Sequence, residues 1–468
     1  MPATVLAGLV QNGIHADLYY SDTLQRIDAA PFTRAWWYRT EFTLPPDYDD
    51  QRVWLHLDGI NYRADIWLNG RRIAGADDVV GTFRQFEFDI TQWVHAGAAN
   101  ALAVEVTPPD LANDLTLTWV DWNPAPPDGG MGIWRDVYLT RSGPVALRHP
   151  AVATKLDLPS LATAHLTVSA ELTNTSAASV VVDVVGAIDD GAISFTQTIT
   201  LAPSESKRVS FDEPQVPQLR LDHPKLWWPR DLGAPDRHRL VVTARVDNVV
   251  SDTQAIHFGI RQVSSQLTAS GGRLFQINGK PLFVRGGAWA PDMLLRPNGK
   301  QMEAHVRYAN DIGLNAIRLE GKLVGDELFD MLDANGMVAI VGWNCCDRWQ
   351  DWPKWTAADH AIATASLRDQ LLRLRNHSSV IDFLIGSDLA PPADVERELL
   401  AVVDETRWPN VVSSSAASTT TPLLGQSGFK MTGPYDWVAP SYWTLDTTRG
   451  GAYGFNTETS PGPAIPTL

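Results

Sequence analysis

The chain has 468 residues, 44% of them hydrophobic and 20% charged, which is enough for roughly two to four folded domains and argues against disorder. Its 38 lysines and arginines against 54 aspartates and glutamates leave a formal net charge of −16. This argues against nucleic acid as a partner, because phosphate binding requires a basic surface. No apolar run approaches the ~20 residues that a membrane span needs, so no membrane partner is predicted.

Residues 1–145 have the pattern of an all-β domain. The amino-terminal string MPATVLAGLVQNG has no basic stretch before its short apolar run, so it lacks the pattern of a signal peptide, and the compartment stays open. Asn69 and Gly70 close a strand-like run and indicate a type I′ hairpin. Predicted strands span 35–44, 52–58, 62–68, 83–89 and 101–106, a spacing typical of a sandwich or jelly roll.

Residues 146–265 are predicted to form a second β-rich unit. Runs over 164–172 and 180–188 are alternating or continuously apolar, and the run over 240–246 precedes a strand that ends at Phe258. About seven strands in a stretch of this length indicate an immunoglobulin-like sandwich. We find no motif with catalytic chemistry in this unit.

Residues 266–468 change to alternating strands and helices, which is typical of a (β/α)8 TIM barrel. Strands are predicted over 281–286, 316–320, 337–343, 380–388, 411–415, 437–443 and 452–458, and helices over 302–312, 326–335, 361–375 and 393–405. A closed barrel needs eight strands, and only about seven can be recognised. We therefore expect a barrel that is incomplete at the carboxyl terminus.

The two cysteines, Cys345 and Cys346, are adjacent in the sequence. Neighbouring cysteines rarely bond to each other because the geometry is strained. Two sulfurs without a second pair nearby also make a poor zinc site. We therefore expect buried structural thiols, and neither a metal nor a cofactor is predicted.

Two carboxylates follow predicted strands of the third unit. Asp388 ends the string RLRNHSSVIDFLIGSD at the fourth strand, and Glu458 lies in GFNTETSPG at the end of the seventh. The carboxyl ends of barrel strands open on one face, so these side chains can oppose each other across a sugar ring. Either carboxylate alone would more often be a helix cap or a surface ion pair. Together they have the placement that the carboxylate pair of a glycosidase requires.

Several strings resemble glycoside hydrolase family 2. In that family an arginine and Asn-His precede a strand that usually ends in Asn-Glu, whereas this chain has Ser387-Asp388, and Ser378 stands where proline is common. The Ser-Asp ending, GLNAIRLEGK and GWNCCDRWQDW are similar to the exo-β-D-glucosaminidase (exochitosanase) branch. LDGINYRADIWLNG resembles the family's sugar-binding jelly roll, residues 118–139 a segment that packs toward the barrel mouth, and residues 227–229 its Trp-Pro loop. The resemblance implies a chain truncated at both ends, with the first jelly-roll strands missing.

The resemblance also implies a reaction and roles for single residues. Glu458 would be the nucleophile and Asp388 the acid/base of a retaining hydrolase that releases β-linked glucosamine from the non-reducing end of chitosan oligosaccharides. Ser387 is shorter than asparagine and leaves room for a different 2-substituent. Glu320 would pair with a protonated 2-amino group. Alternatively, Glu320 forms a structural ion pair with Lys322 or Arg285.

Other residues at predicted strand ends or in loops are expected to form the walls of a pocket-shaped site. Aromatic faces in such places can stack on sugar rings. The candidates are Trp289, Asp292, Asp347, Tyr442 and Trp443. Two further functions stay open: a β-mannosidase or β-galactosidase of the same family, or a truncated chain that binds carbohydrate without turnover.

Overall fold

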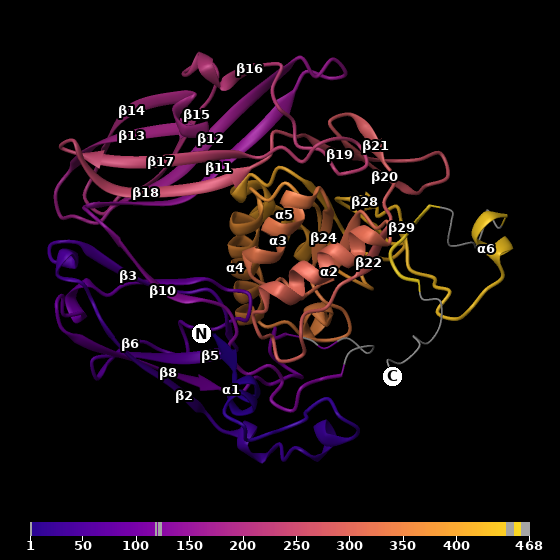
Figure 1. The fold of residues 1–468 in the computed structure, drawn as a ribbon, viewed down its shortest axis with the longest axis horizontal. Coiled ribbons are helices and arrows are strands. Elements are labelled where there is room, and N and C mark those ends of the chain that lie inside the picture. The colour runs from indigo at the N-terminus through magenta and orange to yellow at the C-terminus, as the bar shows by residue number, and fades with distance from the viewer. Residues whose placement is uncertain (1, 118, 120–123, 446–453, 460–468) are drawn as a thin grey trace.

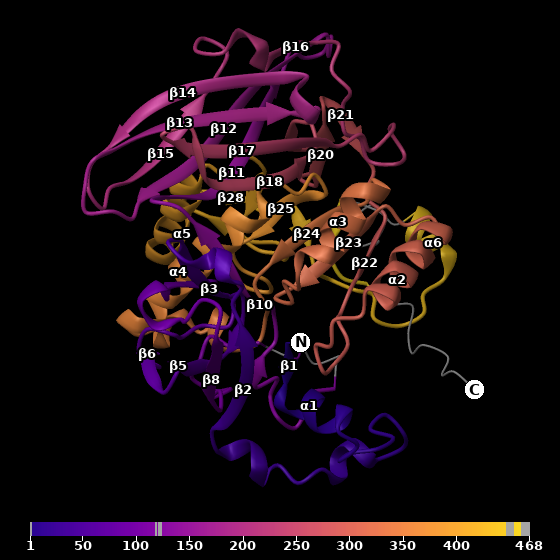
Figure 2. The same cartoon turned by 60° about the vertical axis from the view of Figure 1, so that its left-hand side comes forward.

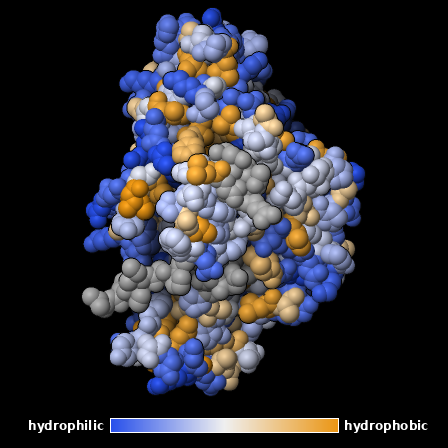
Figure 3. All heavy atoms as spheres, turned by 90° about the vertical axis from the view of Figure 1, so that its right-hand side faces the viewer, coloured by the Kyte–Doolittle hydropathy of each residue, from blue (hydrophilic) through white to orange (hydrophobic). Residues whose placement is uncertain are grey.

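The computed structural model describes residues 2–117, 119, 124–445 and 454–459. Two β-rich units flank a unit of helices around a parallel sheet, and this third unit lies between them in both views (Figures 1 and 2). On the face shown in Figure 3, hydrophobic residues are scattered among hydrophilic ones. None of the helices in the described ranges combines the length and apolar composition that a bilayer crossing needs.

The first unit contains two main antiparallel sheets, in the strand orders β2-β8-β5-β6 and β10-β3-β7. Burial alternates along β3 and β5, so one side of each strand faces a core that includes Leu55 and Ile66. The Asn69-Gly70 hairpin between β5 and β6 is confirmed, because both residues have the positive φ that a type I′ turn requires. The bounds are β2 Trp36–Thr43, β3 Arg52–Leu57, β5 Arg63–Leu68, β6 Arg71–Ala74, β7 Phe86–Asp89, β8 Ala99–Thr107 and β10 Val137–Ser142.

Short elements complete the first unit. A small sheet in the order β1-β9-β4 lies beside a helix that the sequence pattern did not indicate. Thr4 begins this helix, because its side chain accepts a hydrogen bond from the Ala7 N–H. The bounds are β1 Ala3–Thr4, α1 Val5–Gln11, β4 Ile60–Asn61 and β9 Gly132–Ile133.

The second unit pairs a sheet in the order β14-β13-β17-β18 with a sheet in the order β11-β12-β15, to which β16 is added. Their facing side chains, among them Leu166, Val184 and Val242, form a separate buried core. The bounds are β11 Val145–Leu156, β12 Thr163–Asn174, β13 Val180–Ile188, β14 Ile193–Leu201, β15 Ser206–Phe211, β16 Arg220–Asp222, β17 His238–Val246 and β18 Val249–Phe258. A small antiparallel sheet of β19 Val263–Leu267, β20 Arg273–Ile277 and β21 Lys280–Leu282 leads to the third unit.

The third unit contains five parallel strands in sequential order, from β22 to β26. Every residue of β23, β24 and β25 is buried, which explains why these strands are largely apolar, with Arg318, Glu320 and Asp382 as buried charged exceptions. The bounds are β22 Gly286–Ala288, α2 Gly299–Asp311, β23 Ala316–Glu320, α3 Asp326–Asn335, β24 Val338–Gly342, α4 Ala357–Leu374, β25 Val380–Leu384, α5 Ala393–Thr406 and β26 Val411–Ser413. The predicted positions of these helices and of β23, β24 and β26 agree with the structure, whereas the strand predicted over 380–388 ends at Leu384, so Asp388 lies in the segment after it.

The predicted strand pattern is wrong on both sides of this sheet. The first parallel strand begins at Gly286, because residues 280–282 pair with β20 in the antiparallel sheet. Where a sixth strand was expected, Pro440 begins a short helix, α6 Pro440–Thr444, set apart from the parallel sheet (Figure 1). Proline has no N–H for a strand ladder and favours the first turn of a helix.

The carboxyl-terminal segment adds only short strands to the described structure. β30 Phe455–Asn456 lies within the predicted seventh strand and pairs in parallel with β29 Phe429–Lys430, and residues 452 and 453 lie outside the described ranges. β27 Thr420–Thr421 and β28 Gly425–Gln426 form a separate antiparallel pair. In the described part of the chain, the ladder from β22 to β26 is therefore an open sheet and does not close into the expected barrel.

The segment between α4 and β25 joins the second unit to the parallel sheet. Arg375 donates to the carbonyl oxygens of His149 and Thr406, and the Asn376 amide donates to the Pro150 carbonyl at 2.9 Å. His377 Nδ1 lies 2.9 Å from a carboxylate oxygen of Asp333 on α3. The arginine and Asn-His of the family-like string thus hold β25 in place from the end opposite Asp388.

Candidate active site

A cavity of about 1110 Å3 runs along β22 and β23 and reaches the carboxyl ends of the parallel strands. Its wall brings together polar side chains from β23, from the segment after β25 and from the carboxyl-terminal segment. They are Arg318, Glu320, Asp388, Tyr435 and Glu458. The two predicted catalytic carboxylates and Glu320 therefore share one cavity, although their positions span much of the third unit.

Glu320 and Arg318 occupy the same side of β23, two residues apart. Ser387 Oγ donates to Glu320 Oε1 at 2.5 Å and accepts from Arg318 Nη2 at 3.0 Å. Arg318 Nη2 also lies 3.4 Å from Glu320 Oε1. Glu320 is thus paired with Arg318 and not with Lys322 or Arg285, the partners considered from the sequence. All three members of this network are at least nine-tenths buried.

Asp388 follows a tight turn after β25. A side chain at Gly386 would collide with the backbone oxygens of Leu389 and Ser414, so glycine permits the close approach. The Gln350 amide, turned so that both its polar atoms find partners, accepts from the N–H groups of Ser387 and Asp388 at 2.7 and 2.9 Å. These contacts fix the backbone that carries the Asp388 carboxyl group.

The surroundings of Asp388 favour its protonated form. Burial raises the pKa of the Asp388 carboxyl, and the negative charges of Glu320 and Glu458 raise it further. Arg318 acts in the opposite direction with a smaller effect. Asp388 therefore has the direction of pKa shift that a proton donor near neutral pH requires.

Glu458 follows β30 and faces Asp388 across the cavity. Arg318 Nη1 donates to Glu458 Oε1 at 2.8 Å, and Tyr435 Oη donates to Oε2 at 3.2 Å. Glu320, Asp388 and Glu458 each place one carboxyl oxygen within 4.8 Å of the others. Such a cluster is close enough to hold a cation, but Arg318 already supplies a positive charge to Glu320 and Glu458.

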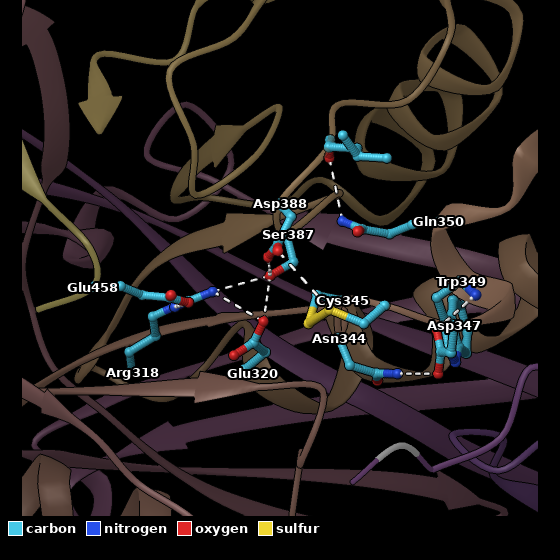
Figure 4. Close-up of a disulfide and its surroundings, with 12 residues drawn as sticks. Arg318, Glu320, Asn344, Cys345, Asp347, Trp349, Gln350, Ser387, Asp388 and Glu458 are labelled. Atoms are coloured by element: carbon cyan, nitrogen blue, oxygen red, sulfur yellow. Dashed lines mark hydrogen bonds and ion pairs between the residues drawn. A yellow bond between two sulfur atoms is a disulfide. The ribbon is translucent and has the colours of Figure 1, made fainter. Parts of the chain in front are cut away.

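The prediction of free thiols at Cys345 and Cys346 is wrong. The two sulfurs form a disulfide, and both residues line the cavity (Figure 4). Cys345 is buried, whereas Cys346 is exposed within the wall and its Sγ lies 3.9 Å from Asp388 Oδ2. Neighbouring cysteines rarely form a disulfide, but these two do so in the turn after β24, where Cys346 adopts a positive φ of 70°.

The structure places Trp289, Asp292 and Asp347 outside this cavity. Trp289 and Asp292 line a second cavity of about 250 Å3, beside Trp134 and Arg135 of the first unit. Trp289 Nε1 contacts His305, and Asp292 accepts hydrogen bonds from Tyr19 and Arg296. They are therefore brought together with each other and not with Asp388.

Asp347 lies on the far side of the disulfide from Glu458 (Figure 4). Its carboxylate accepts from the Trp349 N–H at 2.9 Å and from the Asn344 amide at 2.7 Å, which caps a short turn. Burial raises the pKa of Asp347 to about 8. Tyr442 belongs to α6 and is not among the described residues that form the wall of the larger cavity, and the predicted role of Trp443, also in α6, depends on a side chain outside the described part of the structure.

Sequence reasoning missed Arg318, Gln350 and Tyr435. Arg318 could have been found, because a residue two positions before Glu320 on a strand points to the same side. Gln350 is in the string GWNCCDRWQDW, but nothing in its spacing indicates that it meets the backbone of Asp388. No sequence pattern indicates Tyr435, because it lies in an irregular segment and contacts Glu458 only in the folded structure.

Comparison with known proteins was made by sequence and by structure. Residues 1–115 match the family model described as the glycosyl hydrolase 2 galactose-binding domain-like, and residues 145–261 match that of glycosyl hydrolases family 2. An exo-β-D-glucosaminidase of Streptomyces avermitilis is 44% identical over 473 aligned positions, covering 100% of this chain and 52% of the relative. One of Amycolatopsis orientalis is 42% identical, covering 100% of this chain and 45% of the relative.

A solved structure gives the same picture in three dimensions. The crystal structure of the exo-chitosanase of Amycolatopsis orientalis superposes with a TM-score of 0.94 at 42% identity. The match covers 99% of this chain and 55% of that chain. This chain thus spans about half the length of the curated relatives that it matches.

Proposed function

Since this chain belongs to glycosyl hydrolase family 2, we propose that it is a retaining glycosidase that releases β-linked glucosamine from the non-reducing end of chitosan oligosaccharides. The observation that carries the proposal is the cluster of Glu320, Asp388 and Glu458, whose oxygens approach within 4.8 Å of one another. Retaining glycosidases hold their two carboxyl groups about 5–5.5 Å apart, whereas inverting enzymes leave about 6.5–9.5 Å for a water. A separation this short supports the retaining mechanism.

The first step joins the sugar to the protein. Glu458 attacks the anomeric carbon while Asp388 gives its proton to the glycosidic oxygen, so the bond to the leaving sugar breaks as the glycosyl–Glu458 ester forms. Arg318 and Tyr435 hold the two Glu458 oxygens and orient the attacking one. The raised pKa of Asp388 keeps the proton in place until the sugar binds.

The second step releases the sugar. Asp388, now ionised, takes a proton from water as that water attacks the anomeric carbon, and the Glu458 ester breaks. Two inversions at one carbon leave the β configuration. Asp is one methylene shorter than Glu, and the turn at Gly386 together with the Gln350 amide fixes the backbone from which its carboxyl group extends.

The selectivity proposal concerns the 2-amino group of the sugar. Glu320 is 6% exposed and already bonded to Ser387 and Arg318, so its carboxylate is held in a fixed direction. Glu320 and Glu458 share the single positive charge of Arg318, so a protonated amine beside Glu320 would balance the second carboxylate, whereas a hydroxyl would not. Ser387 leaves space for the amine, because its side chain is short and turned toward Glu320.

We also propose that the open sheet β22–β26 belongs to a (β/α)8 barrel, with a jelly-roll domain over 1–145, an immunoglobulin-like domain over 146–265 and the catalytic domain over 266–468. The sequential parallel order of the five strands and the four helices between them supports this architecture. A structure of the chain with its flanking coding sequence would test it, and an open sheet in that structure would contradict it.

The catalytic proposal is tested with Asp388→Asn and Glu458→Gln. Each change should lower kcat on chitosan oligosaccharides by about 10³-fold or more, because each removes one reacting carboxyl group. The loss in Asp388→Asn should be smaller with nitrophenyl β-glucosaminide, whose leaving group needs less protonation. Product release followed by NMR should show the β-anomer first.

Glu398→Gln is the matched control, since Glu398 pairs with His360 on the outside of the helices and lies away from the cavity. It should retain full activity. Preference for nitrophenyl mannoside or galactoside would exclude the amino-sugar selectivity. Oligosaccharide binding that is unchanged in both variants, with no turnover by the unaltered chain, would favour a binding protein instead.

A further inference from the structure

The Cys345–Cys346 disulfide lies in the wall of the catalytic cavity, directly after β24 (Figure 4). On one side, Cys346 Sγ approaches Asp388 Oδ2 at 3.9 Å. On the other side, the chain continues into the turn that carries Gln350, whose amide meets the backbone of Ser387 and Asp388. The disulfide thus lies between β24 and the turn that carries Gln350, and it also contacts the Asp388 carboxyl group.

The oxidation state of these sulfurs decides what Asp388 faces. A thiol can donate a hydrogen bond through its S–H group, whereas a disulfide sulfur has no proton to donate. Among the described residues, Ser387 Oγ lies a long 3.5 Å from Asp388 Oδ1, but its single proton is donated to Glu320 Oε1 at 2.5 Å. Oδ2, the oxygen nearest the disulfide, therefore faces a surface without a donor.

We propose that the Cys345–Cys346 disulfide is a positioning element for the acid/base Asp388, forming a wall without hydrogen-bond donors that leaves Oδ2 free to carry and deliver the catalytic proton. The inference rests on the proposed function, because it assigns a task to the disulfide within that reaction. It goes beyond the assignment of the carboxylates by explaining why two adjacent cysteines line the cavity.

The other charged and titratable groups around Asp388 act in known directions. Glu320 from β23 and Glu458 from the carboxyl-terminal segment raise the pKa of Asp388 together with its burial, and Arg318 from β23 lowers it. Tyr435 also faces this group, and its own pKa is raised by burial and by the charge of Glu458. Two thiols after β24 would add a donor to the ionised carboxylate and so lower the pKa of Asp388.

The bond itself is tested first by alkylation and mass spectrometry. Iodoacetamide should not modify Cys345 or Cys346 in the native chain. After treatment with dithiothreitol it should modify both, because the dithiol is oxidised to a cyclic disulfide while each cysteine sulfur gains one hydrogen. Alkylation of either residue before reduction would overturn the proposal.

The positioning role is tested by the pH dependence of kcat in the oxidised and reduced chain. Reduction should move the alkaline limb, which reports the proton on Asp388, to lower pH by about half to one unit. Two double variants separate donor chemistry from structure. Cys345→Ser with Cys346→Ser supplies hydroxyl donors and should move the limb in the same direction, whereas Cys345→Ala with Cys346→Ala should leave it in place.

Neither double variant should respond to dithiothreitol, and circular dichroism checks that both fold. If a variant does not fold, the comparison of the oxidised and reduced unaltered chain decides alone. An equal fall of kcat at every pH, or a limb at the same pH in both redox states, would overturn the positioning role.

Failure of the proposed function is distinguishable from failure of this inference. A chain with no turnover in either redox state would contradict the glycosidase proposal. The disulfide is then judged on the carbon-13 titration of the Asp388 carboxyl group, assigned by its loss in Asp388→Asn. A lower titration midpoint of the Asp388 carboxyl group after reduction supports the proposal that the disulfide is a wall without hydrogen-bond donors, and an unchanged midpoint overturns that proposal.

Discussion

Ser387 is the residue that connects the parts of the site. It is fully buried, donates to Glu320 and accepts from Arg318, which in turn donates to Glu458. A small hydroxyl can serve both contacts because it is at once donor and acceptor. The geometry around the proposed amine site and around the proposed nucleophile is therefore coupled through one side chain.

Replacing Glu320 with Gln tests whether this residue recognises the 2-amino group of the sugar. The change keeps the shape of the side chain and removes its charge, so kcat/KM for nitrophenyl β-glucosaminide should fall about 10²- to 10³-fold. Activity on the corresponding β-glucoside, which has a 2-hydroxyl group, should fall much less. Steady-state kinetics on the two substrates gives the ratio.

Glu303→Gln on the exposed side of α2 is the control for this exchange. It should leave both activities unchanged. An unaltered glucosaminide-to-glucoside ratio in Glu320→Gln would show that Glu320 does not recognise the amine.

At the scale of elements, α3 and β25 are held together by a buried ion pair. Burial by itself lowers the pKa of His377, but the negative charges of Asp333 and Asp326 outweigh it and raise the pKa to about 10. Asp333 also accepts from the Ser379 N–H at the start of β25. A single carboxylate thus fixes both the imidazole and the strand.

Replacing His377 with Ala should destabilise the third unit by about 3–5 kcal/mol at neutral pH, because Asp333 is left buried without its partner. The folded pKa lies above the ordinary 6.5, so this stability is complete below about pH 6.5 and is lost as the pH rises through about 10. Urea unfolding of variant and unaltered chain at several pH values measures the difference.

His360→Ala provides the comparison, since His360 forms a partly exposed pair with Glu398. Exposed pairs contribute about 0–1 kcal/mol. Equal destabilisation by His377→Ala and His360→Ala would show that the buried His377–Asp333 pair contributes no more to stability than the partly exposed pair.

At the scale of the whole molecule, Asp382 makes stability depend on pH. It lies in the middle of β25 with no exposed surface, and its Oδ2 accepts from Ser413 at 2.7 Å. Burial raises its pKa to about 7. Because this value lies above the unfolded one, the stabilisation is present at low pH and is lost as the pH rises toward 7.

Replacing Asp382 with Asn should remove this loss. Between about pH 4 and 7, the difference in the free energy of unfolding between the variant and the unaltered chain should grow by about 1 kcal/mol per pH unit in favour of the variant. Thermal unfolding across this range measures the change, with Asp311→Asn at the exposed end of α2 as control. Parallel stability curves for the variant and the unaltered chain would contradict the assignment.

The sequence by itself determined many of the local elements and indicated two carboxylates that share the cavity. α3 ends at Asn335 because Gly336 adopts a left-handed conformation, and β24 is a short apolar run, VAIVG, so both have signals that depend only on near neighbours. Asp388 and Glu458 were found because each lies in a family-like string at a strand end. Pattern and spacing sufficed in these cases.

Only the tertiary structure decided which side chains meet. Arg318 reaches Glu458, Tyr435 reaches the same carboxylate, and Trp289 turns to a different cavity, because these contacts depend on how distant segments pack. The disulfide likewise depends on the shape of one turn after β24, which no spacing rule describes. Helix and strand periodicity depends on neighbouring residues in the sequence. The direction in which a side chain points across a cavity depends instead on how the whole unit packs.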